Sequence, residues 1–199
     1  MEKLCAALSF GGILTKEEID DIILHFEEKQ LQEGKEFLSI GKVCNEIGFV
    51  DSGIIRGYSV SAKGEEATKY FFREKQFIVN LESYYSHKPS TMALQAITSS
   101  RVLSIKRQSW EELTEKIPKL FILTKSLAEA NLLNKLKDND FLNFGTAAGK
   151  YGEFIKRYPE LALHIPQQYI ACYLKITSQS LSRIRKTLGK KDRLGENAR

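Results

Sequence analysis

Polar side chains that can bond to the edges of bases gather near the C-terminus, at Ser178, Gln179, Ser182 and Arg183. A glutamine amide can pair with adenine, and an arginine guanidinium group can pair with the O6 and N7 atoms of guanine. The spacing puts these residues in the first turns of one predicted helix, which is where a recognition helix meets the major groove. We therefore expect this segment to contact double-stranded DNA.

Side chains suited to phosphate binding surround this group, and we expect backbone contacts from Thr177, Arg185, Lys186 and Lys190. The charge of the whole chain follows the same division. From Lys150 onward there are eleven Lys or Arg and four Asp or Glu, a net charge of +7. The first 149 residues contain 19 Lys or Arg and 21 Asp or Glu, a net charge of −2. A basic segment with a folding pattern is attracted to phosphate backbones.

A helix-turn-helix over residues 165–188 would position these side chains. The sequence predicts a first helix from Pro166 or Gln167 to Tyr173. The second should begin with Thr177 as its cap and end near Leu188, with Gly189 just past its end. Lys175 lies in the turn, where glycine is common. The alternative is an ordinary helical hairpin with a solvated basic face. Small or apolar residues occupy the positions that the motif buries, namely Ile170, Ala171, Leu174, Ile176, Leu181 and Ile184.

The N-terminal half predicts an antiparallel β-roll. Thr15-Lys16-Glu17-Glu18 is a capping box, so a helix should run from there to about Glu28. From Gln30 to about Ile105, short runs rich in Ile, Val, Phe, Tyr and Thr alternate with glycine-containing breaks, which is the pattern of a sandwich or jelly roll. The expected strands are residues 37–40, 46–50, 54–60, 70–72, 77–81, 93–98 and 102–106.

A long helix over residues 119–137 should follow, after a helix that the capping box Ser109-Trp110-Glu111-Glu112 begins. It has two apolar stripes, of which one should pack on the roll and the other on a second copy of the chain. The second stripe is Phe121, Ala128, Leu132 and Leu136. The alternative is an ordinary core helix. The stripe at the a and d positions of a heptad, which we assign to a dimer interface, is Leu120, Leu123, Leu127, Ala130 and Asn134, with Asn134 fitting a contact that sets the register.

The expected domains are a sensor roll over residues 1–117, a dimerisation helix and hinge over 118–140, and a DNA-binding domain over 141–199. The hinge is placed at Asp138-Asn139-Asp140 and again at residues 143–145, because these stretches are rich in Asp, Asn and Gly.

Residue usage argues against several other classes of protein. Cys5, Cys44 and Cys172 have no C-x-x-C spacing, so we expect reduced thiols, no metal and no cofactor. The three histidines are scattered, and no catalytic residue or enzymatic activity is expected. No apolar run approaches the ~18–20 residues that span a bilayer. The N-terminus is not a signal peptide, so a cytoplasmic protein without membrane contact is the expectation.

The order of these elements resembles the Crp/Fnr superfamily of bacterial regulators over nearly the whole chain. Gly41 and Gly53 match hallmark glycines of the family's roll. The motifs Tyr-Ile-Ala-x-Tyr-Leu-x-Ile-Thr, over residues 169–177, and Leu-Ser-Arg-Ile-Arg, over 181–185, are similar to those of its Bacteroidetes-type branch. The resemblance implies a cyclic-nucleotide-binding-like roll, a dimerisation helix and a DNA-binding domain.

The ligand site departs from the family pattern. Cyclic-nucleotide binders of this family carry a Gly-Glu-x-Gly turn, whose Glu holds the ribose, and an Arg about ten residues on that pairs with the cyclic phosphate. Here Asn80 stands at the Glu position and Ser90 at the Arg position. Without a cation for the phosphate, a charge-assisted contact is lost, so we expect no response to a cyclic nucleotide. The degenerate pocket would comprise Val79, Asn80, Leu81, Ser90 and Thr91.

The sequence as a whole predicts an α+β protein that regulates transcription as a homodimer on a two-fold symmetric operator. The resemblance puts Ser178, Gln179 and Arg183 at the main base-contacting positions and implies RNA polymerase as a partner. Only about ten polar residues follow Leu188, so the wing that follows the recognition helix in this family should be absent or reduced. The effector is unknown. The competing hypothesis is a ligand-sensing or protein-interaction module with a vestigial DNA-binding domain.

Overall fold

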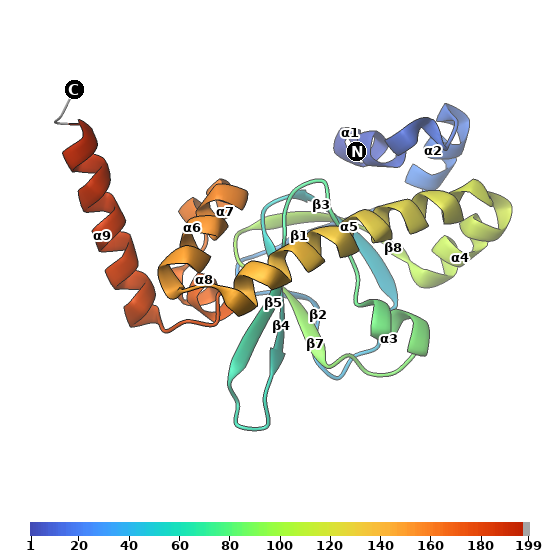
Figure 1. The fold of residues 1–199 in the computed structure, drawn as a ribbon. Coiled ribbons are helices and arrows are strands. Elements are labelled where there is room, and N and C mark those ends of the chain that lie inside the picture. The colour runs from blue at the N-terminus through green and yellow to red at the C-terminus, as the bar shows by residue number, and fades with distance from the viewer. Residues whose placement is uncertain (197–199) are drawn as a thin grey trace. The chain divides into compact units, whose positions relative to one another are not determined.

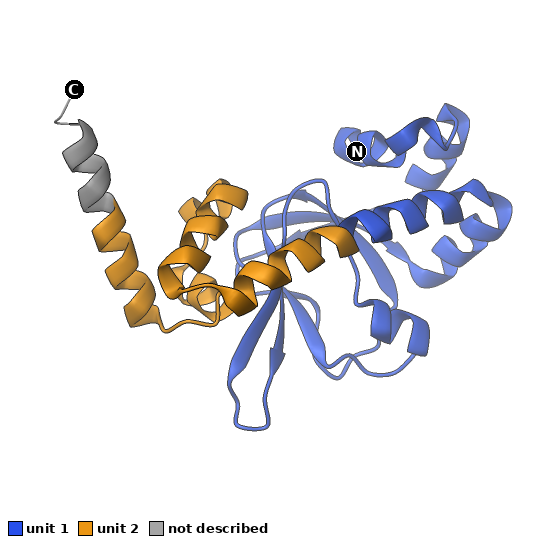
Figure 2. Ribbon diagram, in the orientation of Figure 1, with its two compact units in different colours: residues 1–131 blue, residues 132–199 orange. Residues whose placement is uncertain are grey.

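The computed structural model describes residues 1–196 and the side chains of residues 1–188. It contains two compact units, residues 1–131 and 132–199, which Figure 2 distinguishes by colour. The boundary falls inside helix α5 (Lys119–Phe144), which contributes residues to both units. No helix of the described chain is both long enough and apolar enough to cross a bilayer.

Two four-stranded antiparallel sheets form a roll in the first unit (Figure 1). One has the strand order β1-β8-β3-β6 and the other the order β2-β7-β4-β5. Neighbouring strands are often far apart in sequence, as in a jelly roll, so the expected fold class is confirmed. The strands are β1 (Glu27–Leu31), β2 (Glu36–Leu38), β3 (Glu46–Ser52), β4 (Ile55–Val60), β5 (Glu66–Phe72), β6 (Phe77–Ile78), β7 (Met92–Ala96) and β8 (Ser100–Lys106).

The two glycines that match the family's roll both have left-handed backbone, with φ of +83° at Gly41 and +92° at Gly53. At Gly53 space is also lacking. A Cβ atom there would lie 2.2 Å from the Oγ and 2.7 Å from the Cα of Ser100, in β8. Any side chain at Gly53 would therefore collide with a neighbouring strand as well as strain the turn.

Helix α2 begins as expected but ends earlier. Glu18 donates its amide to the Thr15 hydroxyl (3.3 Å) and its carboxylate accepts the Thr15 amide (2.7 Å), so the capping box is confirmed. Helix α2 (Lys16–Ile23) then ends five residues before the expected Glu28, because Glu27–Leu31 pairs with β8 as β1. The strand was missed because its sequence, EEKQL, contains no β-branched or aromatic residue.

The second expected capping box is wrong. Helix α4 (Arg107–Lys116) begins two residues before Ser109, and its cap residue, Lys106, makes no side-chain cap bond. The other helical segments of this unit, besides α2 and the start of α5, are α1 (Glu2–Leu8), the 3-10 turn η1 (Phe10–Gly12) and α3 (Leu81–Ser86). In Figure 1, α1, α2, α4 and the start of α5 gather on one side of the roll.

The core of the first unit takes in part of the stripe that was assigned to a dimer. Leu120 and Leu123 are fully buried in it, and Leu127 packs against it. Leu120 and Leu123 cannot therefore contact a second copy without unfolding their own unit, so assigning them to the dimer interface is wrong. The large apolar side chains that α5 leaves exposed include three of the second stripe. They are Phe121, Ile122, Leu132, Leu133, Leu136 and Phe144.

The second unit consists of the end of α5 and four further helices, α6 (Ala147–Arg157), α7 (Pro159–His164), α8 (Gln167–Tyr173) and α9 (Ser178–Glu196). Helix α5 passes through Asp138–Asp140 without a break, so the hinge expected there is helical. A small core joins these elements. Its fully or nearly fully buried members are Tyr151, Phe154, Leu161, Ile165, Ile170, Ala171, Leu174 and Leu181.

Candidate nucleic-acid interface and ligand pocket

A six-residue turn closes helix α8 and redirects the chain toward α9. The amide of Ile176 donates to the carbonyl of Ala171 (3.0 Å), and the amide of Lys175 donates to the carbonyl of Cys172 (3.2 Å). These two bonds define a Schellman motif, which needs a left-handed residue between the helix end and Ile176. Lys175 supplies it with φ of +56°. The sequence correctly marked this as the position where glycine is common.

The start of α9 is capped as expected. Thr177 Oγ1 accepts the amide of Ser180 (3.1 Å), and Leu181, one turn into the helix, is fully buried with Ile170 and Leu174. Two residues differ from the expected burial. Ile176 and Ile184 are only partly covered, because they lie at the edge of this small core. The helix also continues through Gly189 to Glu196, so glycine does not end it there.

The outward face of α9 presents the side chains that the sequence assigned to bases. Ser178, Gln179 and Arg183 are exposed, and Ser182 is partly covered. No side chain among the described residues bonds to that of Gln179 or Arg183. Of the expected phosphate contacts, Thr177 and Lys186 are exposed and Arg185 is partly covered, whereas the side chain of Lys190 lies outside the described residues. No strand follows α9 within residues 1–196, so the described chain has no wing.

Two of the five residues assigned to a ligand pocket bond to each other. Asn80 Nδ2 donates to Ser90 Oγ (2.7 Å), and Asn80 Oδ1 accepts the amide of Ser83 (3.1 Å), which caps helix α3. Ser90 Oγ in turn donates to the carbonyl of Met92 (2.5 Å). Asn80, Ser83 and Ser90 are all buried, so their bonds replace contacts with water. Val79 is partly covered, and Leu81 and Thr91 are exposed.

A second set of bonds connects α3 and the residues after it to Cys44 and Arg107. Ser83 Oγ donates to the carbonyl of Lys88 (2.6 Å) and accepts the amide of Cys44 (2.9 Å). Arg107, which is nearly fully buried, donates to the carbonyl of Cys44 and contacts His87 Nδ1. Its guanidinium carbon lies 4.7 Å from the centre of the Tyr84 ring. The segment around α3 is therefore fixed to the roll by its own side chains.

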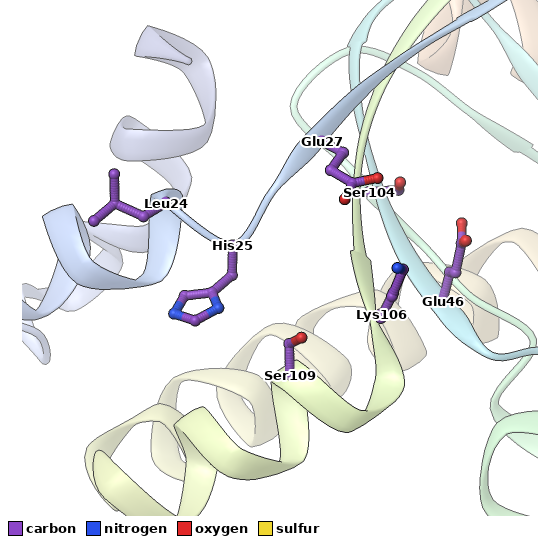
Figure 3. Close-up of a pocket in the computed structure, with 7 residues that line it drawn as sticks. All are labelled: Leu24, His25, Glu27, Glu46, Ser104, Lys106 and Ser109. Carbon is purple, nitrogen blue, oxygen red and sulfur yellow. The ribbon is translucent and has the colours of Figure 1, made fainter.

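A hollow of about 240 Å³ lies elsewhere on the first unit, beside β1, β8 and the start of α4 (Figure 3). Polar side chains of both charges dominate its lining. Glu46, one of them, is already paired with Lys29. Among the described residues, no cluster of three or more His, Cys, Asp or Glu side chains could hold a metal ion. The lining residues are Leu24, His25, Glu27, Glu46, Ser104, Lys106 and Ser109.

Comparison with known proteins identifies the first unit. Residues 28–116 match the family described as the cyclic nucleotide-binding domain. This chain contains a cyclic nucleotide-binding domain. No curated protein sequence matches the chain significantly.

Solved structures with a similar fold extend beyond this domain. FixK2 from Bradyrhizobium japonicum has a TM-score of 0.73 at 18% identity, covering 84% of this chain and 86% of its own. A protein from Eubacterium rectale assigned to the crp/fnr family has a TM-score of 0.70 at 14% identity, covering 90% and 86%. The global regulator CLP from Xanthomonas campestris has a TM-score of 0.69 at 13% identity, covering 89% and 93%. The chain has the fold of a Crp/Fnr regulator.

The match of residues 28–116 to the cyclic nucleotide-binding domain bears on the bonds of Asn80 and Ser90. In the cyclic nucleotide-binding domain, these are the positions at which the resemblance expects the ribose-binding Glu and the phosphate-binding Arg. In this chain the side chains at those two expected positions bond to each other. Burial also raises the pKa of the Cys44 thiol, which favours its protonated form.

One cluster was missed from the sequence. The carboxylate of Asp138 accepts bonds from Tyr173, Tyr158 and Arg157, although the sequence placed Asp138 in a hinge. No sequence signal could have found this cluster, because the three partners lie 19 to 35 residues from Asp138 and share no motif with it.

Proposed function

We propose that this chain is a sequence-specific DNA-binding transcription regulator that acts as a homodimer on a two-fold symmetric operator. The observation that carries the proposal is the exposed face of α9. A buried helix-turn-helix core supports it from below, a threonine caps its first turn, and Gln179 and Arg183 point into solvent without partners among the described side chains. Such side chains at the start of a recognition helix can bond to base edges.

Dimerisation is supported by the apolar side chains that α5 exposes. Phe121 and Ile122 lie near its start, and Leu132, Leu133 and Leu136 follow about three to four turns later, each more than half exposed. Burying such a stripe against a second copy of the helix would remove it from water. Two copies would then offer two recognition helices to half-sites one DNA turn apart, about 34 Å.

The effector of the roll is proposed not to be a cyclic nucleotide. Asn80 and Ser90 are hydrogen-bonded to each other, and neither carries the positive charge that would pair with a cyclic phosphate. Regulation by a different small molecule, or by dimer formation alone, is compatible with the pocket. RNA polymerase is the proposed partner on promoter DNA, by analogy with regulators of this fold.

The test is selection of bound duplexes from a random DNA pool by the purified full chain. The expected result is one enriched motif with two inverted half-sites, bound with a steep dependence on salt. Enrichment of no motif, with weak binding to all duplexes alike, would instead favour a ligand-sensing module whose DNA-binding domain is vestigial. The match of residues 28–116 to a ligand-binding family is the observation that supports this second candidate.

A further inference from the structure

The carboxylate of Asp138 joins three segments of the second unit. Asp138 lies near the end of α5, and its side chain is only 14% exposed. Its Oδ2 atom accepts the hydroxyl of Tyr173 (3.1 Å) and the hydroxyl of Tyr158, while its Oδ1 atom accepts Nη1 of Arg157 (3.1 Å). Tyr173 belongs to α8, the first helix of the helix-turn-helix, and Arg157 ends α6.

The partners of Asp138 are themselves held in place. Arg157 also bonds to Glu153 (3.4 Å) and lies over the ring of Phe141, 5.0 Å from its centre. The Tyr173 ring packs 5.9 Å from that of Phe154, in the core of the unit. Burial, and then the charge of Asp138, raise the pKa of Tyr173, so its hydroxyl stays protonated and can donate. Bonds to an ionised, partly buried acceptor are stronger than neutral ones.

A second hydrogen bond between the helix-turn-helix and α5 lies about one turn further along α5. Lys175, the left-handed residue between the two helices of the motif, donates from Nζ to Oδ1 of Asn143 (2.9 Å). Asn143 donates in turn to Asn139 (2.8 Å), on the same face of α5. The helix-turn-helix is therefore bonded to α5 through its first helix and through its turn.

We infer that Asp138 is a positioning residue for DNA binding, which fixes the helix-turn-helix to the long helix and so sets the separation of the two recognition helices in the dimer. This inference rests on the proposed function. Leu136 is one of the exposed apolar residues of α5 that we propose contact the second copy. It precedes Asp138 by only two residues on the same continuous helix. The dimer contact and the attachment of the DNA-binding helices thus occupy adjoining turns, with no flexible segment between them.

The test measures tolerance to half-site spacing. The full-length protein is titrated on the selected operator, on operators one or two base pairs longer or shorter between half-sites, and on a duplex with a single half-site. One base pair moves a half-site by about 3.4 Å and rotates it by roughly 36°, so a fixed pair of recognition helices should discriminate sharply. For the wild type, we expect one spacing to be preferred by about tenfold or more over its neighbours.

Asp138→Asn keeps the shape of the side chain but removes its charge and one acceptor atom. We expect the spacing preference to fall to about threefold or less, with single half-site binding changed by less than about twofold. Asp140→Asn, the same substitution at an exposed position of the same helix, is the matched control and should behave as the wild type. Tyr173→Phe removes one hydroxyl only and provides a second variant if Asp138→Asn fails to fold.

Two results would overturn the inference while leaving the proposed function intact. One is a wild-type spacing preference in both variants. The other is an equal loss of affinity on every duplex, including the single half-site, which would make Asp138 a stabilising residue only. A wild-type chain that selects no duplex would overturn the proposed function itself, and the inference would fall with it.

Discussion

The two polar sites of this chain differ in what their side chains bond to. In the roll, Asn80 and Ser90 are buried and bond to each other. On α9, Gln179 and Arg183 are exposed, and neither side chain bonds to another among the described residues. A ligand entering the first site must break bonds that the protein already makes, whereas a ligand at the second displaces only water. We call the bonded pair in the roll the closed site and the exposed face of α9 the open site.

The largest effect on operator affinity is expected from a variant that cannot form the proposed dimer. Replacing both Leu132 and Leu136 by Asp puts charges into the exposed stripe of α5 and should yield a monomer. Losing simultaneous contact with two half-sites should weaken operator binding by roughly 10²–10⁴-fold. Sedimentation and a binding titration provide the measurement.

The control for this double variant is Leu123→Ala. Because Leu123 lies in the core of its own unit, the substitution should cost about 2–5 kcal/mol of stability and leave the sedimenting mass unchanged. If Leu123→Ala were a monomer, or if the double variant remained a dimer, the dimer interface would instead be the stripe that contains Leu120 and Leu123.

Arg183→Ala tests whether the open site reads bases. It should cost about 1–3 kcal/mol on the selected operator and relax preference at one base pair in each half-site. Lys186→Ala, on the same helix, should instead weaken binding to all duplexes about equally and flatten the salt dependence. Titrations on operator and scrambled duplex at two salt concentrations separate the two effects. Equal weakening of both duplexes by Arg183→Ala would assign Arg183 to the phosphates.

The closed site should be both unresponsive and stabilising. Millimolar cyclic AMP should leave the melting temperature unchanged, whereas tight binding would raise it by several degrees. Asn80→Ala should lower the free energy of unfolding by about 1–2 kcal/mol, because α3 loses its cap and Ser90 loses a partner. Thr91→Ala, at an exposed neighbour, should have no such effect. A clear rise in melting temperature with the nucleotide would show that the pocket opens.

The smallest effect concerns the turn that supports the open site. Lys175→Gly removes the Cβ atom from a residue with left-handed backbone, which should stabilise the second unit by up to about 1 kcal/mol. The substitution also removes the exposed bond to Asn143, so the contribution of that bond must be subtracted. Lys175→Ala retains the Cβ and loses the bond, so it should be the less stable of the two. Thermal unfolding compares them directly, and the reverse order would mean that the Asn143 bond outweighs the backbone strain.

What the sequence could predict depended on how local the signal was. Seven strands were expected from β-branched and aromatic runs, and the two helices of the motif from caps and burial spacing. Strand β1 was missed because its residues are charged and polar and it forms only through pairing with β8, about 75 residues away. Tertiary pairing overrode local propensity there.

The sites show the same limit. The exposed face of α9 followed from helical periodicity, which is a property of neighbouring residues. Periodicity could not show which stripe of α5 faces a second copy, because both stripes are apolar. The packing of Leu120 and Leu123 in the core of the first unit decides between them. The bonds of Asp138 reach up to 35 residues along the chain, and no spacing rule connects their members.

The bond between Asn80 and Ser90 also bears on how this protein can change over evolutionary time. Introducing an arginine at Ser90 removes the partner of Asn80, and introducing a glutamate at Asn80 places a charge beside a serine, without the cation it needs. Either step alone leaves a buried polar group unsatisfied, at a cost of about 1–3 kcal/mol or more. A change of both positions to the residues of cyclic-nucleotide binders would therefore pass through a less stable intermediate, whichever position changed first.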